Sequence, residues 1–378
     1  MRDGFGEAPA EQTKLRRART GLRALDREHA CPGFTLFAPY QSDDTTVYLI
    51  DLNGTVVHTW RMPWPAQYAR LTERGTLLYN GRTPATRGSF LDGKPYKVGA
   101  ILEADWNGRV LWEVQHPDHH HDGILLRNGN VLLLGLVPLP RELAARIEGG
   151  MVAREHHGAM YGDCLIELTK NGQLVRKYPV WEQLDPRSER ITAIQEPRDA
   201  WSNGNGLAEL PNGDIVVSFR TISTIIILDR RTGAVIWKLS APPLCGQHAP
   251  TPLANGNLLI FDNGPHRLDH PLPFSRVLEV ELATKRIVWE YRERREIDFF
   301  SPRISNAQRL PNGNTLICEG DFGRLFEVTI AGEVVWEYVN PYFAGPPSLQ
   351  NNRIFRAYRY TTEEIASARA EPSFSRSS

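Results

Sequence analysis

The sequence predicts an all-β protein: a six-bladed β-propeller with four-stranded antiparallel blades and a short N-terminal helical extension. Three observations predict it. A strand–turn–strand pattern recurs five times, a second hairpin follows each copy, and an aromatic residue recurs at one position of the second hairpin. Two hairpins make one four-stranded blade, and a closed circle of blades leaves few sheet edges exposed.

The first hairpins have apolar strands on either side of a tight turn. Four copies turn at Asn-Gly, which is a strong hairpin signal, and the weaker fifth copy turns at Arg-Gly. The copies are QYARLTERGTLLYNGR (67–82), HDGILLRNGNVLLLGL (121–136), NGLAELPNGDIVVSFR (205–220), HAPTPLANGNLLIFDN (248–263) and SNAQRLPNGNTLICEG (305–320).

The second hairpins share an aromatic residue near the end of their last strand. We expect this residue to pack between neighbouring sheets, because large aromatic side chains contribute most of the contact area in such cores. It is Trp60, Trp112, Trp237, Trp289 and Trp336, with Tyr178 in the remaining copy.

The sixth blade has to be assembled from both ends of the chain. FTLFAPYQSDDTTVYLIDLNGTVVHTW (34–60) supplies its outer part, and NNRIFRAYRYTT (351–362) supplies a closing strand, so that no edge stays open. We therefore expect one propeller domain over residues 29–362. Residues 1–28 form a polar or helical extension in this interpretation, and residues 363–378 a disordered tail.

Composition narrows the classes of partner. The chain has 378 residues, with 44 basic and 44 acidic side chains, so nothing in its charge favours nucleic acid or an anionic membrane. No apolar run reaches the roughly 18 residues of a membrane span, and the N-terminus lacks the apolar core of a signal peptide. We expect a cytoplasmic protein that acts on a small molecule. The four scattered cysteines are expected to be inert buried thiols.

Polar residues recur at the two outer ends of the first hairpins. Since a hairpin returns on itself, both positions lie at one edge of the sheet, and on a propeller they gather around one mouth of the central channel. The strand-start column holds Gln67, His121, Asn205, His248 and Ser305. The strand-end column holds Arg82, Leu136, Arg220, Asn263 and Gly320, with Asp262 and Glu319 one step earlier.

Two interpretations of these columns remain open. Polar residues at strand ends can simply satisfy backbone groups. Two histidines, an arginine, amides and carboxylates around one mouth instead indicate a functional site, which we expect there. His156 and His157, in the long insertion 137–162, are either a lid over it or part of an exposed loop.

The hairpin motifs resemble the bacterial arylsulfate sulfotransferase family from about Cys31 to Pro341. The likeness is carried by residues 32–60, HHDGILLRNGNVLLL (120–134), GQHAPTPLANGNLLIFDNG (246–264) and SNAQRLPNGNTLICEG (305–320). The resemblance implies a six-bladed propeller that transfers a sulfuryl group from a phenolic sulfate ester to another phenol. It implies no nucleotide sulfate donor and no other cofactor.

The resemblance also implies roles for individual residues. His248 matches the histidine that becomes transiently sulfated, and Arg220 the arginine that binds the sulfuryl oxygens. His121, with His120 beside it, matches a histidine suited to proton transfer. These types suit the chemistry, because imidazole is a competent nucleophile and proton carrier and guanidinium stabilises an anionic group. The expected substrate-binding residues are His120, Asn203, Asn205, Asn263, Asp262, Glu319, Ser305 and Gln67.

The chain departs from the family pattern in three places. A family histidine is replaced by Asn203, whose amide can donate a hydrogen bond but cannot carry a proton. No export signal is visible, and alanine follows His248 where many relatives have an acid.

Two other functions therefore remain open beside sulfuryl transfer. One is a hydrolase or lyase assisted by a divalent metal at the same channel, with ligands from DHHHD (118–122), His248, Asp262 and Glu319. Adjacent histidines of a strand point to opposite faces, so that run alone is weak support for a metal. The other is a non-catalytic ligand-binding propeller. Donor, acceptor and oligomeric state are left open.

Overall fold

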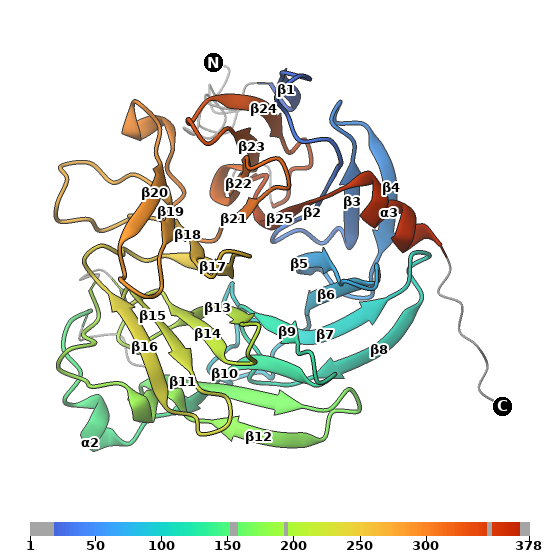
Figure 1. The fold of residues 1–378 in the computed structure, drawn as a ribbon. Helices are drawn as coiled ribbons and strands as arrows, with labels where there is room; N and C mark the ends of the chain where they lie inside the picture. The colour runs from blue at the N-terminus through green and yellow to red at the C-terminus, as the bar shows by residue number, and fades with distance from the viewer. Residues whose placement is uncertain (1–18, 152–157, 193–195, 346–349, 371–378) are drawn as a thin grey trace, which may run out of the picture.

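A computed structural model describes residues 19–151, 158–192, 196–345 and 350–370, and it confirms the predicted six-bladed propeller. Six antiparallel sheets stand around a common axis, and strands β5, β9, β13, β17, β21 and β25 lie nearest the centre (Figure 1). The insertion histidines 156 and 157 lie outside the described residues.

We number the blades in chain order, from the innermost strand outward. Blade 1 contains β25 (Ile354–Tyr360), β2 (Phe34–Pro39), β3 (Thr46–Ile50) and β4 (Val56–Arg61). Blade 2 contains β5 (Ala66–Leu71), β6 (Leu77–Arg82), β7 (Gly99–Ala104) and β8 (Val110–Gln115). Blade 3 contains β9 (Gly123–Leu125), β10 (Val131–Pro138), β11 (Tyr161–Leu168) and β12 (Leu174–Tyr178).

The remaining three blades repeat this order. Blade 4 contains β13 (Gly204–Glu209), β14 (Ile215–Phe219), β15 (Thr224–Leu228) and β16 (Val235–Ser240). Blade 5 contains β17 (His248–Pro252), β18 (Leu258–Asp262), β19 (Arg276–Val280) and β20 (Ile287–Tyr291). Blade 6 contains β21 (Asn306–Arg309), β22 (Thr315–Glu319), β23 (Arg324–Val328), β24 (Val334–Val339) and β1 (Gly21–Leu25). Short helices are α2 (Arg141–Ala144), α3 (Thr362–Arg369), η1 (Val180–Gln183), η2 (Glu296–Asp298) and η3 (Gly320–Phe322).

The ring closes as predicted, with the C-terminal strand β25 paired antiparallel to β2 of blade 1. The two ends of the chain differ from the expectation. Gly21–Leu25 is a strand rather than a helix, because it pairs with the exposed edge of β24. Thr362–Arg369 is a helix rather than a disordered tail. Its capping box joins Thr361 to Glu364, and Ile365 is buried in the core between blades 1 and 2.

The turn asparagines have a structural role beyond the turn itself. In blade 5, Gly256 has φ +85°, which glycine adopts without strain, and Asn255 and Asn257 both donate to the carboxylate of Glu279 on the third strand, at 2.9 and 2.7 Å. Blade 3 repeats this arrangement around Glu167. These bonds lock each inner hairpin onto the strand behind it.

The repeated tryptophans join neighbouring blades, as predicted for a packing element. Trp336 of blade 6 is buried and its indole N–H donates to the Leu52 carbonyl of blade 1 at 2.9 Å. Trp237 reaches Leu282 of the next blade in the same way at 2.8 Å. Each indole thus fixes the outer edge of one blade on a turn of the next.

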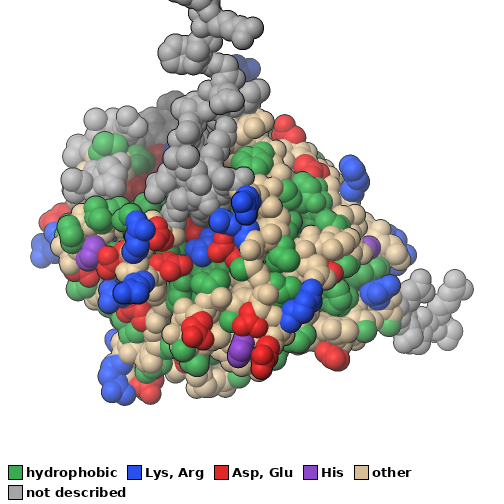
Figure 2. All heavy atoms as spheres, turned by 90° about the horizontal axis from the view of Figure 1, so that it is seen from above, with side chains coloured by type: hydrophobic (Ala, Val, Ile, Leu, Met, Phe, Trp, Pro, Cys, Tyr) green, Lys and Arg blue, Asp and Glu red, His purple; other side chains and the backbone are tan. Residues whose placement is uncertain are grey.

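The surface shows no dominant charge. On the face seen in Figure 2, Lys and Arg side chains alternate with Asp and Glu, as the equal counts of 44 and 44 suggest. In the described residues, no helix combines the length and apolar character needed to cross a bilayer.

Candidate active site

The inner strands all begin on one face of the disc, which we call the loop face because the long connections also lie there. The strand-start residues are almost completely buried around the axis. They form the channel ring, defined as Gln67, His121, Asn205, His248 and Ser305, with exposures of 0, 6, 0, 2 and 1%. Asn205 donates to the Gln247 carbonyl at 2.8 Å and Ile304 donates to His248 at 3.2 Å, so consecutive blades touch at the ring. The predicted convergence is therefore present.

The His248 ring is held in one tautomer by its two neighbours. The backbone N–H of Ile304 can only donate, so Nε2 of His248, 3.2 Å away, accepts. Nδ1 must then carry the proton, which it donates to Oδ1 of Asn263 at 2.7 Å. The amide nitrogen of Asn263 donates to the carbonyls of Ser301 and Ile304, and this fixes its oxygen toward the imidazole.

The surroundings keep His248 neutral. Burial lowers its pKa most, and the nearby Arg220 charge lowers it further, to about 3. A neutral imidazole with its proton on Nδ1 has a lone pair on Nε2, which is the form a nucleophile needs.

His121 belongs to a chain of two imidazoles and a carboxylate. Its ring stacks on Tyr96, with centroids 4.6 Å apart, and its Nδ1 lies 2.8 Å from Nδ1 of His120. Nε2 of His120 lies 3.3 Å from Oδ1 of Asp163, which also accepts from Ser202 and Gly204. In the described chain Nε2 of His120 makes no hydrogen bond, and the contact between the two Nδ1 atoms needs one donor and one acceptor, so only one of these two nitrogens carries a proton.

Burial and nearby positive charges lower the pKa of both ring histidines. The pKa of His121 is well below its usual range, mainly through burial and then through the positive charge that His120, His248, Arg220 and Arg356 can carry. These groups therefore lie within electrostatic reach of one another. The resting His121 is therefore neutral, which is the form that can accept a proton.

Arg220 lies at the loop face but is already paired. Its Nη1 donates to Oε1 of Glu196 at 2.6 Å, and its backbone N–H donates to the carbonyl of Asn203 at 3.2 Å. Both side chains of the pair are only partly exposed, at 18 and 20%. Glu196 comes from the insertion before blade 4, and the hairpin pattern gave no signal for it.

Arg356 was also missed by sequence reasoning. It projects from the closing strand β25 and is 4% exposed, and its Nη2 donates to Asp122 at 2.9 Å and to the Asn205 carbonyl at 3.0 Å. Asp122 also accepts from Tyr68 at 2.5 Å and from the Leu207 N–H at 2.8 Å. This cluster joins four blades beneath the channel ring. The available signal was the arginine at every third position of RIFRAYRY (353–360).

Two predicted ligands face away from the site. Asp262 accepts from Arg267 at 2.6 Å and from Arg276 at 2.9 Å, and Glu319 accepts from Arg324 at 3.3 Å. Because neighbouring residues of a strand point to opposite faces, Asp262 cannot share the orientation of Asn263. Arginines thus engage both carboxylates, and the substrate-binding role expected for Asp262 and Glu319 stays a prediction. The metal hypothesis loses two of its carboxylates, and no metal-like group of three His, Cys, Asp or Glu occurs in the described ranges.

The remaining predicted residues differ in how they are bonded. The Ser305 hydroxyl is engaged with Ser301 and the Gly320 N–H, both at 2.9 Å. Within the described chain, both polar atoms of the Gln67 side chain and Oδ1 of Asn203 and Asn205 are buried without a hydrogen-bond partner. Buried polar atoms are normally paired, so these groups are available to a polar ligand.

Backbone strain concentrates at the same place. Five non-glycine residues at or beside the channel ring have positive φ, a region that costs on the order of 1–3 kcal/mol each for such residues. They are His121 (50°), Asn203 (50°), Ala249 (47°), Ile304 (51°) and Ser305 (87°). Strain of this kind accumulates where function fixes a backbone, which supports a site at the ring.

Comparison with known proteins identifies the family of this chain. A family model described as arylsulfotransferase (ASST) matches residues 86–341, which include His121, Arg220 and His248. The arylsulfate sulfotransferase AssT of Escherichia coli O6:H1 is 35% identical, over 68% of this chain and 54% of that protein. The chain thus spans about half the length of this curated relative. A Bacteroides caccae protein of unknown function has a similar fold, with a TM-score of 0.51 and 14% identity over 87% of this chain and 99% of its own.

Proposed function

This chain belongs to the arylsulfotransferase family, and on that premise we propose that it transfers a sulfuryl group between phenols through a sulfated His248. The single observation that carries the proposal is the tautomer of His248. With the proton held on Nδ1 by Asn263, the lone pair of Nε2 is the reactive group.

In the first half-reaction, Nε2 of His248 attacks the sulfur of an aryl sulfate. The N–S bond forms as the S–O bond to the aromatic ring breaks, and a phenolate leaves with the bonding electrons. Nδ1 keeps its proton, so the sulfated ring carries a positive charge that Oδ1 of Asn263 stabilises. The Ile304 N–H has to give up its contact with Nε2 at this moment.

In the second half-reaction, the hydroxyl oxygen of an acceptor phenol attacks the same sulfur. Its proton passes to Nε2 of His121, the N–S bond breaks, and the electron pair returns to His248. Negative charge on the transferred group raises the proton affinity of His121 at that stage, and His120 and Asp163 can share the proton. His121 then releases the proton to solvent, where it balances the phenolate released in the first half-reaction, so that one ester and one phenol are exchanged.

Arg220 and Arg356 are the cations that hold the sulfuryl oxygens in this proposal. Arg220 can do so only when Glu196 releases it, since the carboxylate and a sulfuryl group compete for the same guanidinium. Asn203 offers an amide where the family has a histidine. Proton transfer therefore depends on His121 and His120 alone.

A burst experiment tests the proposal. Mixing the protein with 4-nitrophenyl sulfate and no acceptor should release about one 4-nitrophenolate per active site, and phenol should then restore turnover. His248→Ala should abolish the burst, whereas His270→Gln, at a partly exposed histidine outside the ring, should keep it. A full burst in His248→Ala would refute the assignment.

A further inference from the structure

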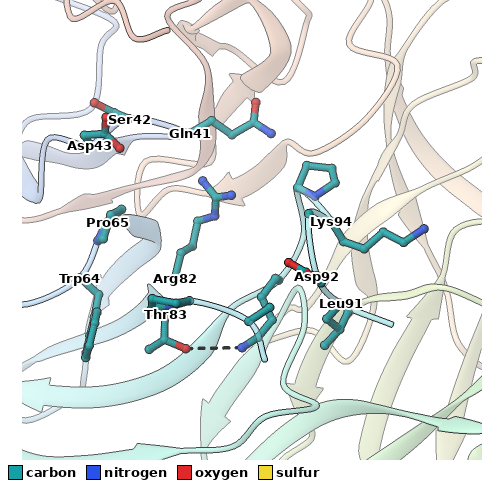
Figure 3. A pocket seen from close by; sticks show the side chains of 15 residues that line it. Gln41, Ser42, Asp43, Trp64, Pro65, Arg82, Thr83, Leu91, Asp92 and Lys94 are labelled. Atoms are coloured by element: carbon teal, nitrogen blue, oxygen red, sulfur yellow. Dashed lines mark hydrogen bonds between the residues drawn. The ribbon is translucent and has the colours of Figure 1, made fainter. Parts of the chain in front are cut away.

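A hollow of about 520 Å³ lies on the loop face between blades 1 and 2, apart from the channel histidines. Figure 3 shows its walls: the segment around Gln41, the pair Trp64–Pro65, and the loop from Arg82 to Lys97. Gln41 accepts a hydrogen bond from Arg353, the residue just before β25 begins, so the hollow opens beside the channel mouth.

Two cations of this hollow have no ion-pair partner in the described chain, and the carboxylate of Asp118 acts on Lys97 only from a longer distance. Lys97 is 5% exposed, and its ammonium group reaches only Oγ1 of Thr83, 3.4 Å away (dashed line in Figure 3). The Nε atom of Arg82 is buried without a partner, and the guanidinium lies 5.5 Å from the centroid of the Tyr40 ring. In the described part of the chain, neither side chain has a carboxylate within 4.0 Å.

The other charges of the hollow do not neutralise this pair. Lys94 is bound to Asp199 at 2.5 Å, and the two acids of the lining, Asp43 and Asp92, are exposed at its rim where water screens them. Burial lowers the pKa of Lys97 to about 8, which shows that its charge is held at a cost. An anionic group held at Lys97 would offset that cost, and Arg82, whose guanidinium extends toward Gln41 in Figure 3, lines another part of the same hollow.

The walls suit a flat apolar group attached to the anion. Trp64, Pro65, Leu91 and Pro95 provide apolar surface around the two cations. The volume lies within the range of about 300–1,000 Å³ of small-molecule sites, and one aromatic ring with one charged substituent matches the walls and the cations together.

We propose that this hollow, the Arg82–Lys97 pocket, binds a small aromatic anion at a site separate from His248. The loop that forms its wall also carries Tyr96, whose ring stacks on His121. A role in selecting acidic phenols for transfer rests on the proposed function, whereas binding itself does not.

Calorimetric titration with 4-hydroxybenzoate tests the pocket. Arg82→Gln and Lys97→Met should each raise the Kd about tenfold or more, as expected for losing a charged hydrogen-bond partner. Arg87→Gln, an exposed arginine of the same loop, and His248→Ala should leave the Kd unchanged. Phenol and inorganic sulfate should each bind at least about tenfold more weakly, because each lacks one half of the ligand.

Circular dichroism and thermal melting establish that each variant is folded. Arg82→Gln, at a half-buried side chain, keeps the test decisive if Lys97→Met fails to fold. The proposed pocket is overturned if 4-hydroxybenzoate does not bind, or if its binding is lost in His248→Ala and kept in Arg82→Gln. It is also overturned if inorganic sulfate binds as tightly as 4-hydroxybenzoate. Binding that follows Arg82 and Lys97 in a protein without a burst would instead refute the proposed function alone.

Discussion

Nδ1 of His248 lies 2.7 Å from Oδ1 of Asn263. This contact decides which nitrogen of the imidazole carries the proton and which keeps its lone pair. Asn263→Leu should lower kcat by about 10²-fold or more, since losing the tautomer-fixing partner of a catalytic histidine has effects of up to about 10⁴-fold. Asn263→Asp keeps the acceptor but adds a negative charge that raises the pKa of His248. Its kcat/KM should therefore fall at acidic pH and recover at alkaline pH, a shift that a purely structural role would not produce. Equal kcat in the leucine variant and the native protein would contradict the role.

Glu196 is paired with Arg220, whose guanidinium we assign to binding the sulfuryl group. Glu196→Gln should lower KM for 4-nitrophenyl sulfate by roughly 3–10-fold, because a neutral amide competes less well for Arg220. Steady-state kinetics at low and high salt measure this, with Glu148→Gln, an exposed acid of another insertion, as the control. A higher KM in Glu196→Gln would mean that the carboxylate positions Arg220 instead of blocking it.

The lowered pKa of His121 disfavours the imidazolium that would protonate the departing phenolate in the first half-reaction. The rate of that step should therefore depend steeply on the acidity of the leaving phenol, because the leaving oxygen must carry its charge unaided. A series of substituted phenyl sulfates gives the slope of log(kcat/KM) against phenol pKa. A flat plot in conditions where chemistry limits the rate would show that a general acid is present.

The low pKa of His248, about 3, predicts an unusual pH profile. The reactive form is the neutral one, so lowering the pH removes activity only as it approaches the pKa. The burst rate should stay constant from about pH 8 to about pH 5, whereas a histidine of ordinary pKa near 6.5 would lose most of its reactivity over that range. A midpoint near 6.5 in stopped-flow bursts would contradict the buried, neutral environment.

The pair Arg356–Asp122 should contribute strongly to stability, because it is buried and joins segments that are 234 residues apart in the sequence. Arg356→Met leaves the Asp122 carboxylate buried without its cation, and such losses cost about 3–5 kcal/mol of unfolding free energy. Arg109→Met, in the exposed pair with Asp105, should cost under about 1 kcal/mol. Denaturant unfolding followed by tryptophan fluorescence compares the two, and equal losses would argue against a structural role for the buried pair.

Much of the fold could be predicted because every blade repeats the same kinds of turn and packing residues. Asn-Gly turns and the tryptophan position define each blade, and RIFRAYRY is recognisable as the strand that closes the ring. The ends could not be predicted. Gly21–Leu25 is a strand because it pairs with the edge strand β24. Thr362–Arg369 is a helix that packs Ile365 into the core between blades 1 and 2.

The site was predicted where register alone decides it. His121, Asn205 and His248 reach the channel because each starts an inner strand. A shift of one residue reverses the face of a strand, and Asp262, one step before Asn263, is paired with Arg267 and Arg276. The pattern of the first hairpins carried no signal for these two arginines. Glu196 and Arg356 were missed for a related reason: their partners are fixed by tertiary contacts that no hairpin pattern encodes.

Mass spectrometry of the His248 peptide tests the central claim most directly. After incubation with 4-nitrophenyl sulfate and no acceptor, followed by alkaline digestion, this peptide should gain the mass of one sulfuryl group, with fragmentation placing it on the imidazole, and phenol added before digestion should remove it. An unmodified His248 peptide in protein that still transfers sulfuryl groups to phenol would contradict the account.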